Sequence, residues 1–305
     1  MIFARMSQRW HALRFWREHQ SLSRLALVRR LAAAPGDALF QPLFNHMGRD
    51  AYLMRGLGVG ERVRCVLAHY RFEDATFDTA YQQAVYGGAG VPLWQHEDDG
   101  DRFIIRLEAA PRPGQQGDVS LALVVGDKVL HRLSWTWVEG ALFDADAAML
   151  PFVSQNAGRW SDAGPAFEAF ERVFPNNSPS FFCFSALQGM AESLGIDRVI
   201  AVRAGAHVAY DPADDKAFQN AYDGFWRILG GVEKDARSFL VTLPFYLKPL
   251  QDMPSKHRKR AAQRREHWRA IADSTRSAVL RHRVAPEAAP AVAAATEASA
   301  ADALN

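Results

Sequence analysis

The sequence predicts an α+β protein in which a mainly antiparallel sheet is flanked by helices. Three observations predict this class. Apolar Phe103, Ile105 and Leu107 alternate with charged neighbours, as in a half-buried strand. Gly126-Asp127 separates two further apolar segments, which is typical of a β-hairpin. Apolar residues at helical spacing precede and follow this run of strands, so the helices flank an antiparallel sheet instead of alternating with parallel strands.

The composition is that of a globular protein with a sizeable core. Of its 305 residues 49% are hydrophobic and 23% are charged, and the formal net charge is +2. That charge is too small to imply a polyanionic partner by itself. The two cysteines, Cys65 and Cys183, exclude a disulfide framework, and Cys183 lies in an apolar stretch where a buried, inert thiol is expected.

Neither a secretory nor a membrane-spanning segment is expected. The N-terminus has arginines but lacks the continuous apolar region of a signal peptide. No apolar run approaches the ~20 residues that a transmembrane helix needs. We therefore expect a cytoplasmic protein with no transmembrane segment.

We divide the chain into four parts. Residues 1–60 form a helical N-terminal region, 61–253 an α+β core, 254–283 a basic helix, and 284–305 a disordered tail. Apolar residues at three-residue steps predict one helix over 8–33, which either packs on the core or lies on an anionic membrane surface. The tail is almost entirely Ala, Pro, Glu and Ser and cannot offset its ordering entropy.

The core elements follow from local patterns. Gly195 predicts a left-handed C-cap for the preceding apolar helix, and Gly230-Gly231 ends the later one. Residues 156–158 are expected to form a loop. In chain order we expect a helix over 61–86, a strand at 103–107, a hairpin of 118–126 and 128–138, a strand at 149–155, a helix over 180–194, a strand at 198–202, a helix over 214–230 and a strand at 238–244.

Several segments, taken in order, carry a family resemblance. They are GDVSLALV, LHRLSWTWV, FVSQNAG, FSALQGMAESLGIDRVIAVRAGAHVAY, AYDGFWRILGG, SFLVTLP and MPSKHRKRAAQRREHW, which together cover roughly residues 100–270. In this order they resemble the VirK/YbjX family of Gram-negative bacterial proteins, a domain of unknown function. The resemblance implies association with envelope stress, virulence and resistance to cationic antimicrobial peptides.

The passage around Gln155, Asn156 and Gly158 is similar in layout to GNAT-type acyltransferases, with a strand, a Gly-containing loop and a later helix. In those proteins backbone N–H groups hold the pyrophosphate of an acyl-CoA at a helix N-terminus. The resemblance implies a GNAT-like fold, acyl-CoA as cofactor, and these three residues as its binding site. The alternative is an ordinary connecting loop.

Three residues are candidates for catalysis. His207 follows the 198–202 strand, and a histidine can act there as a general base for an amine or hydroxyl. The alternative is a histidine that is hydrogen-bonded to the loop backbone. On the next helix Tyr222 and Trp226 share a face, as core residues do, whereas Asp223 points away and can pair with an arginine of the C-terminal helix.

The basic helix is the fourth candidate site. Its cations can contact the phosphates of an anionic membrane surface or an envelope lipid precursor, or form a solvated face that partly pairs acidic groups of the core. Nucleic acid is a weaker expectation, because only Trp268 could stack on bases. No HExxH or P-loop pattern points to a metal or nucleotide site. The anion-binding candidates are Lys256, Arg258, Arg260, Arg264 and Arg265.

Two functions remain open. In the first, a cytoplasmic protein of envelope maintenance acts as a GNAT-like acyltransferase, with His207 deprotonating a lipid or sugar amine. In the second, a non-catalytic adaptor engages membrane phosphates or a protein partner through its basic helices, at the periphery of the inner membrane.

Overall fold

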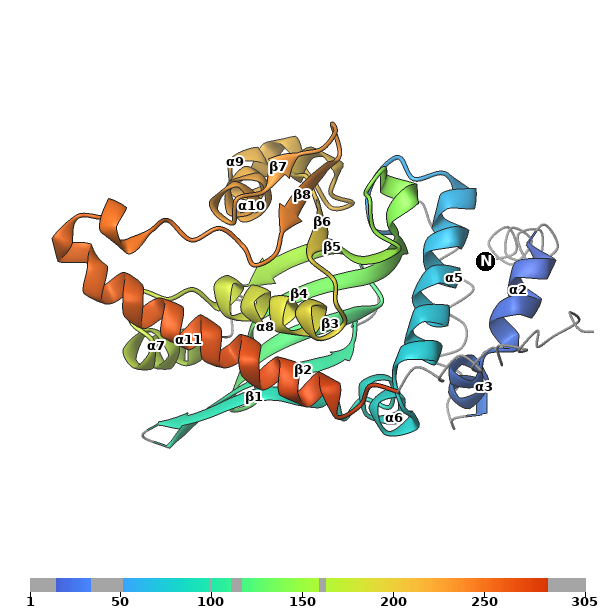
Figure 1. Cartoon of the computed structure of the whole chain (residues 1–305), viewed down its shortest axis with the longest axis horizontal. Helices are drawn as coiled ribbons and strands as arrows, with labels where there is room; N and C mark the ends of the chain where they lie inside the picture. The colour runs from blue at the N-terminus through green and yellow to red at the C-terminus, as the bar shows by residue number, and fades with distance from the viewer. Residues whose placement is uncertain (1–14, 34–51, 99, 111–116, 159–162, 285–305) are drawn as a thin grey trace, which may run out of the picture.

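The computed structural model describes residues 15–33, 52–98, 100–110, 117–158 and 163–284. Within these ranges eight strands form one sheet in the order β1-β2-β3-β4-β5-β6-β8-β7 (Figure 1). Neighbouring strands are antiparallel except for β5 and β6. The predicted fold class, a mainly antiparallel sheet flanked by helices, is confirmed.

The strands agree with the sequence prediction except at the first and seventh, which it missed. The predicted hairpin joins β3 to β4, and its Gly126 has φ +60°, a conformation that favours glycine. The first strand was missed because its last four residues are exposed and polar. The strands are β1 (Val91–Asp98), β2 (Asp101–Ala109), β3 (Val119–Val125), β4 (Lys128–Glu139), β5 (Met149–Gly158), β6 (Arg198–Val202), β7 (Val232–Glu233) and β8 (Ser238–Thr242).

The helices include one that was not predicted, α7. A π-helical segment, Asn220–Gly224, joins α9 to α10, so the helix expected over 214–230 is interrupted. The α-helices are α2 (Trp16–Ser23), α3 (Ala26–Ala33), α5 (Val59–Thr76), α6 (Thr79–Tyr86), α7 (Gly164–Val173), α8 (Pro179–Ser193), α9 (Asp215–Gln219), α10 (Phe225–Ile228) and α11 (Ser255–Leu280).

Two predicted helices are each divided by an aspartate cap. The helix expected over 61–86 breaks before Asp78, whose carboxylate accepts the N–H of Tyr81 at 2.7 Å and starts α6. In the N-terminal region, Asp74 of α5 accepts the N–H groups of Ala26 and Leu27 at 3.2 and 2.6 Å and so starts α3. The predicted single helix over 8–33 is therefore wrong for its described part, and residues 8–14 lie outside the described ranges.

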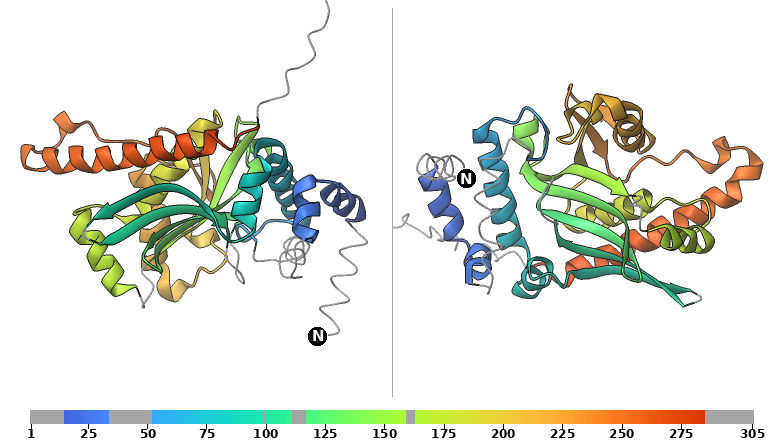
Figure 2. Two further views of the ribbon diagram at one scale, coloured as in Figure 1. Left: turned by 90° about the horizontal axis from the view of Figure 1, so that it is seen from below. Right: turned by 180° about the vertical axis from the view of Figure 1, so that it is seen from behind.

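The described N-terminal helices pack on the core. Leu22, Leu27 and Val28 are buried, and α2 and α3 both contact α5. Most apolar side chains of these helices are therefore used in packing, whereas Trp16 is 57% exposed. Figure 2 shows these helices beside α5, which lies at one end of the sheet.

The layer over the sheet is made by α8 and α11. Helix α8 is buried along most of its length and crosses β3, β4 and β5, while α11 lies on α8 and reaches β1 (Figures 1 and 2). The two helices approach closely at Gly189, where a Cβ would lie 2.2 Å from the carbonyl oxygen of Ala272. Trp268 and Ile271 of α11 are buried, so this helix is part of the core packing.

Cys65 and Cys183 are both free and buried, as predicted for Cys183. None of the helices in the described ranges combines the length and the apolarity needed to cross a bilayer. Of the predicted tail, residues 285–305 lie outside the described part of the chain.

Candidate functional site

The parallel strands β5 and β6 separate soon after they pair. They pair at two positions, Phe152 with Ile200 and Val153 with Ala201. Beyond these positions β5 continues along β4 as far as Gly158, whereas β6 ends at Val202. The edge of β5 that faces β6 therefore has main-chain groups without a strand partner.

The prediction that residues 156–158 form a loop is wrong. Asn156, Ala157 and Gly158 pair with Leu133, Arg132 and His131 of β4, after a register shift near Ser134. An extra residue in a bulge changes which side chains face which side of the sheet. The chain around Gly158 is consequently a strand edge and cannot wrap a pyrophosphate as a glycine-rich loop does.

Tyr222 and His207 fill the gap between the separated strands. The N–H of Asn156 donates to Oη of Tyr222 at 3.4 Å, and Nε2 of His207 lies 2.9 Å from the same oxygen. Nδ1 of His207 accepts the N–H of Ala209 at 3.2 Å. The neutral ring therefore carries its hydrogen on Nε2, which points toward Tyr222.

Burial holds both of these side chains in their neutral forms. Desolvation lowers the pKa of His207 to about 4, the charge of Arg55 acts in the same direction, and a hydrogen bond to the Ser154 backbone opposes them. Desolvation also raises the pKa of Tyr222. Because Ala209 occupies the only lone pair of the His207 ring, this geometry favours a positioning role for His207 over a general-base role.

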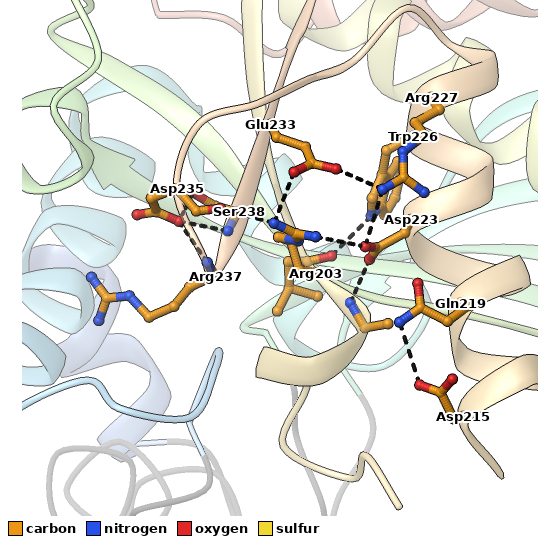
Figure 3. Close-up of polar contacts among 12 residues, drawn as sticks. Arg203, Asp215, Gln219, Asp223, Trp226, Arg227, Glu233, Asp235, Arg237 and Ser238 are labelled. Carbon is orange, nitrogen blue, oxygen red and sulfur yellow. Dashed lines mark hydrogen bonds and ion pairs between the residues drawn. The ribbon is translucent and has the colours of Figure 1, made fainter. Parts of the chain in front are cut away.

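Asp223 belongs to an ion-pair cluster on the other side of the π-helical segment (Figure 3). Its carboxylate is 1% exposed, accepts the N–H of Ala204 at 2.7 Å, and lies 3.3 Å from Arg203 and 3.7 Å from Arg227. Glu233 contacts both arginines. The arginine partners come from the end of β6 and from α10, and not from the C-terminal helix as the sequence suggested. This arrangement is structural pairing that holds the segment after β6.

A pocket of about 300 Å³ opens at the end of β5. Asn156 and Gly158 line it together with His131 of β4, and Ser178 and Ser180 line it from the start of α8. Asn156 and Gly158, two of the three predicted cofactor-binding residues, thus line a pocket together with the N-terminus of α8. In the sequence, α7 lies between these two residues and α8. N–H groups in the first turn of a helix have no intrahelical partner and attract anions.

Gln155, the third predicted cofactor-binding residue, does not line this pocket. Its Oε1 accepts the hydroxyl of Ser134 at 2.9 Å. Successive side chains of a strand point to opposite faces of the sheet, so Gln155 faces away from Asn156.

His131 is the pocket residue that sequence reasoning missed. Its Nε2 lies 2.8 Å from Oδ1 of Asn156, whose Nδ2 donates to the carbonyl of Ala221 at 2.8 Å. The Asn156 amide is thereby oriented, and Nε2 of His131 must carry the hydrogen. Nδ1 keeps its lone pair and lies above Gly158, where a Cβ would come within 2.6 Å of it.

The surroundings of His131 keep its ring neutral. Burial lowers the pKa of His131 to about 4, against the opposing effect of its hydrogen bond to Asn156. At neutral pH the ring therefore offers an unprotonated nitrogen beside the pocket. No local pattern points to this role, because it depends on the register that pairs His131 with Gly158.

The predicted anion-binding residues divide into two kinds. Arg258 donates to the carbonyls of Met253 and Gln251 at 2.9 and 3.0 Å, and Arg264 and Arg265 also donate to backbone carbonyls. Lys256 and Arg260 are exposed. None of the five forms an ion pair with another described residue, so their charges are not neutralised by the described acidic groups of the core.

A family model described as a protein of unknown function, DUF535, matches residues 12–145 and 177–276, which is more than half of the chain. The chain belongs to the DUF535 family. DUF535 is the VirK/YbjX family that the sequence segments resemble, so that recognition is confirmed. No curated protein that was compared with this DUF535 chain matches it.

Among solved structures, this DUF535 protein is similar to two mutants of a cAMP-binding acyltransferase from Mycobacterium smegmatis. One is 15% identical with a TM-score of 0.27 and covers 72% of this chain and 63% of the other. The second is 14% identical with a TM-score of 0.29 and covers 73% and 61%. The chain thus spans less than two thirds of those proteins. Similarity at this level does not establish an activity.

Proposed function

We propose that this DUF535 protein is an acyl-CoA-dependent acyltransferase whose reaction centre lies at the end of β5. The observation that supports this most is the separation of β5 from β6 beside the N-terminus of α8. An open strand edge can pair with the amide groups of an extended pantetheine arm, as an added strand pairs with a sheet. The start of α8 can then interact with the diphosphate.

In the proposed reaction, an amine or hydroxyl of the acceptor attacks the thioester carbonyl. The new C–N or C–O bond forms, the C–S bond breaks, and Nδ1 of His131 accepts the proton of the acceptor. Tyr222 donates its phenolic proton to the leaving sulfur, since its two contacts, with Asn156 and His207, both use its oxygen as an acceptor. His131 then releases its proton to solvent, and the Tyr222 phenolate takes up one proton from solvent, so the protons balance.

His207 and Asp223 have supporting roles in this proposal. His207 orients the Tyr222 hydroxyl, and Asp223 holds the segment that carries His207 through its contact with Ala204. The pantetheine arm would displace the long contact of Tyr222 with Asn156 as it enters the gap. Each residue that acts on the acyl group is then neutral before reaction, which suits a buried site.

The acceptor belongs, in this proposal, to the bacterial envelope, as a lipid or sugar amine. This part rests on the association with envelope stress and peptide resistance that the VirK/YbjX resemblance implies. Exposed Lys256 and Arg260 on α11 can hold the protein at an anionic inner-membrane surface from the cytoplasmic side.

The test is calorimetric titration of the full chain with acetyl-CoA and with palmitoyl-CoA. Asn220 is exposed and lines the pocket, so Asn220→Trp narrows its opening, whereas Lys216→Trp places the same ring on exposed α9 outside the pocket. We expect saturable binding to the wild type and to Lys216→Trp, and at least tenfold weaker binding to Asn220→Trp. Absence of binding to the wild type would overturn the acyltransferase proposal.

The adaptor alternative makes the opposite prediction for His131, whereas both proposals use Lys256 and Arg260 at the membrane. Charge reversal of Lys256 and Arg260 would abolish function in a peptide-sensitivity assay, while His131→Gln would leave it intact. The acyltransferase proposal requires His131→Gln to abolish function in a protein that still folds.

A further inference from the structure

A second pocket, of about 380 Å³, lies beside the first one. The two pockets share Asn177 and Ser178, the residues immediately before α8. Helix α11 and the segment after β8 form most of its wall, through Arg264, Arg265, Trp268, Tyr246, Leu247 and Lys248, and Phe181 of α8 and Ile228 of α10 also line it.

The charged residues of this second pocket are all positive. Lys248, Arg264 and Arg265 line it, and none of its lining residues is an aspartate or a glutamate. The two arginines donate to the backbone carbonyls of Asn176 and Lys248, which leaves their charges unneutralised. Such a pocket attracts an anion, and guanidinium groups are well suited to phosphate.

The apolar part of the second pocket is aromatic and unusually exposed. Trp268 stacks on Phe181, with ring centroids 4.7 Å apart and an interplanar angle of 13°. Ile228 and Tyr246 are 62% and 59% exposed, among the largest exposures of big apolar side chains in the described ranges. Trp268 also has the Arg264 guanidinium 5.9 Å from its ring centroid, so Tyr246 is the exposed ring of this pocket on which a flat aromatic ligand would stack.

Polar atoms around the second pocket lack partners. Oδ1 of Asn177, Nε of Arg264 and Nε1 of Trp268 are buried and have no hydrogen-bond partner among the described residues. Trp268 as a whole is only 9% exposed. Buried polar groups are normally satisfied, and three such atoms around one pocket indicate a ligand with hydrogen-bonding edges.

We propose that the second pocket binds the nucleotide end of coenzyme A, and this inference rests on the proposed function. The adenine lies against the aromatic surface, and the 3′-phosphate and diphosphate meet Arg264, Arg265 and Lys248. The first pocket supports this division, because its charged lining residue is Glu171 and it offers the phosphates no cation. The diphosphate crosses from one pocket to the other at Asn177 and Ser178, beside the N-terminus of α8.

The same features favour a nucleotide over a phospholipid surface. A membrane surface contacts exposed side chains and does not satisfy polar atoms buried behind them. Nε of Arg264 and Nε1 of Trp268 are buried donors without partners on residues that line this pocket, and they suit a ligand with hydrogen-bond acceptors. A nucleotide supplies such acceptors on its base, ribose and phosphates.

The test compares three ligands by calorimetry on the full chain: adenosine 3′,5′-bisphosphate, acetyl-CoA, and S-acetylpantetheine, which lacks the nucleotide. Arg264→Ala/Arg265→Ala removes two charges from the pocket. The control Lys259→Ala/Arg269→Ala removes two exposed charges from the same helix outside it. Exposed Lys248→Glu serves as a second variant, since Arg265 contacts only its backbone carbonyl.

We expect adenosine bisphosphate to bind the wild type and the control, and to bind both pocket variants about tenfold more weakly or worse. Equal affinities for acetyl-CoA and S-acetylpantetheine, without bisphosphate binding, would overturn the nucleotide site and leave the acyltransferase proposal standing. Bisphosphate binding without thioester binding would support the nucleotide site and overturn the acyltransferase proposal. Pocket variants that lose binding to phosphatidylglycerol vesicles but keep bisphosphate binding would assign these arginines to lipid and overturn the inference.

Discussion

Nε2 of His131 donates to Oδ1 of Asn156 over 2.8 Å, and this contact fixes which nitrogen of the ring is free. Asn156 is held in turn by Ala221, so β4, β5 and the π-helical segment meet at one amide. The arrangement leaves Nδ1 of His131 unprotonated above Gly158, where a glycine is needed to leave it uncovered. A proton acceptor thus lies beside the pocket at the end of β5.

The first prediction concerns the protonation of His131. Its pKa of about 4 means that its ring stays neutral to well below the pH at which an exposed histidine titrates. Asn156→Asp would place a carboxylate beside Nε2 and raise the pKa of His131, because the negative charge stabilises the imidazolium. NMR titration of ring-labelled histidine measures the pKa of His131 in the wild type and in Asn156→Asp. The spectrum of His131→Gln assigns the signal. A wild-type midpoint near 6.5 would contradict the buried geometry.

The second prediction concerns stability at low pH. The folded-state pKa values of His131 and His207, each about 4, lie below the ordinary value, so the unfolded chain binds more protons between pH 6.5 and 4. Each histidine therefore lowers the free energy of unfolding as the pH falls, by about 1.4 kcal/mol per pH unit. Urea unfolding at several pH values should show the wild type losing stability relative to His131→Gln over this window. A difference in the free energy of unfolding that stays the same at every pH would contradict this prediction.

The third prediction concerns Glu73 of α5, which is fully buried where this helix packs on β4. Trp137 donates to its Oε1 at 2.8 Å, yet desolvation raises the pKa of Glu73 to about 8. The folded state keeps the proton that the unfolded chain releases above about pH 4.5, so this group costs stability as the pH rises from 4.5 to 8. Glu73→Gln keeps the acceptor and removes the titration, and should be more stable than the wild type at pH 8 but not at pH 4.5. Destabilisation at pH 8 would show that the carboxylate is needed in its charged form.

The fourth prediction concerns the contact of α8 with α11. Gly189→Ala would place a methyl group against the backbone of Ala272, which cannot move without displacing α11, and we expect a loss of about 3 kcal/mol or more. Gly60→Ala is the matched control, because Gly60 lies in exposed helix with nothing within 4 Å of its Cβ position. It should be neutral or stabilising by up to about 1 kcal/mol. Equal effects in chemical unfolding would mean that the helices are not closely packed.

Local sequence signals predicted those elements whose causes are local. Gly126 predicted the hairpin of β3 and β4, and the apolar stripe that ends at Gly195 predicted α8. The strand β1 was missed because its exposed end has no apolar alternation. The single helix predicted over 61–86 did not include the helix break at the Asp78 cap. An exposed edge decides the first case. In the second the cap is local, with Tyr81 three residues from Asp78, and the apolar residues on both sides of it suggested one continuous helix.

The candidate site was only partly predictable, because its contacts join residues that are far apart in the sequence. Asn156 and Gly158 were chosen as loop residues and are strand residues that nevertheless line a pocket. The pairing of His207 with Tyr222 is a contact between residues 15 apart in sequence, across a turn and two short helices. His131 carried no signal at all, because its role depends on the register of β4 against β5 and on the amide orientation of Asn156.

The most direct test of a cofactor site beside His131 is the histidine NMR spectrum of the labelled full chain during titration with acetyl-CoA. His282, which contacts Asp78 at the far end of α11, serves as the internal reference. We predict a saturable shift of the His131 ring signals with the His282 signals unchanged. Saturation with acetyl-CoA that leaves the His131 signals in place would contradict the account.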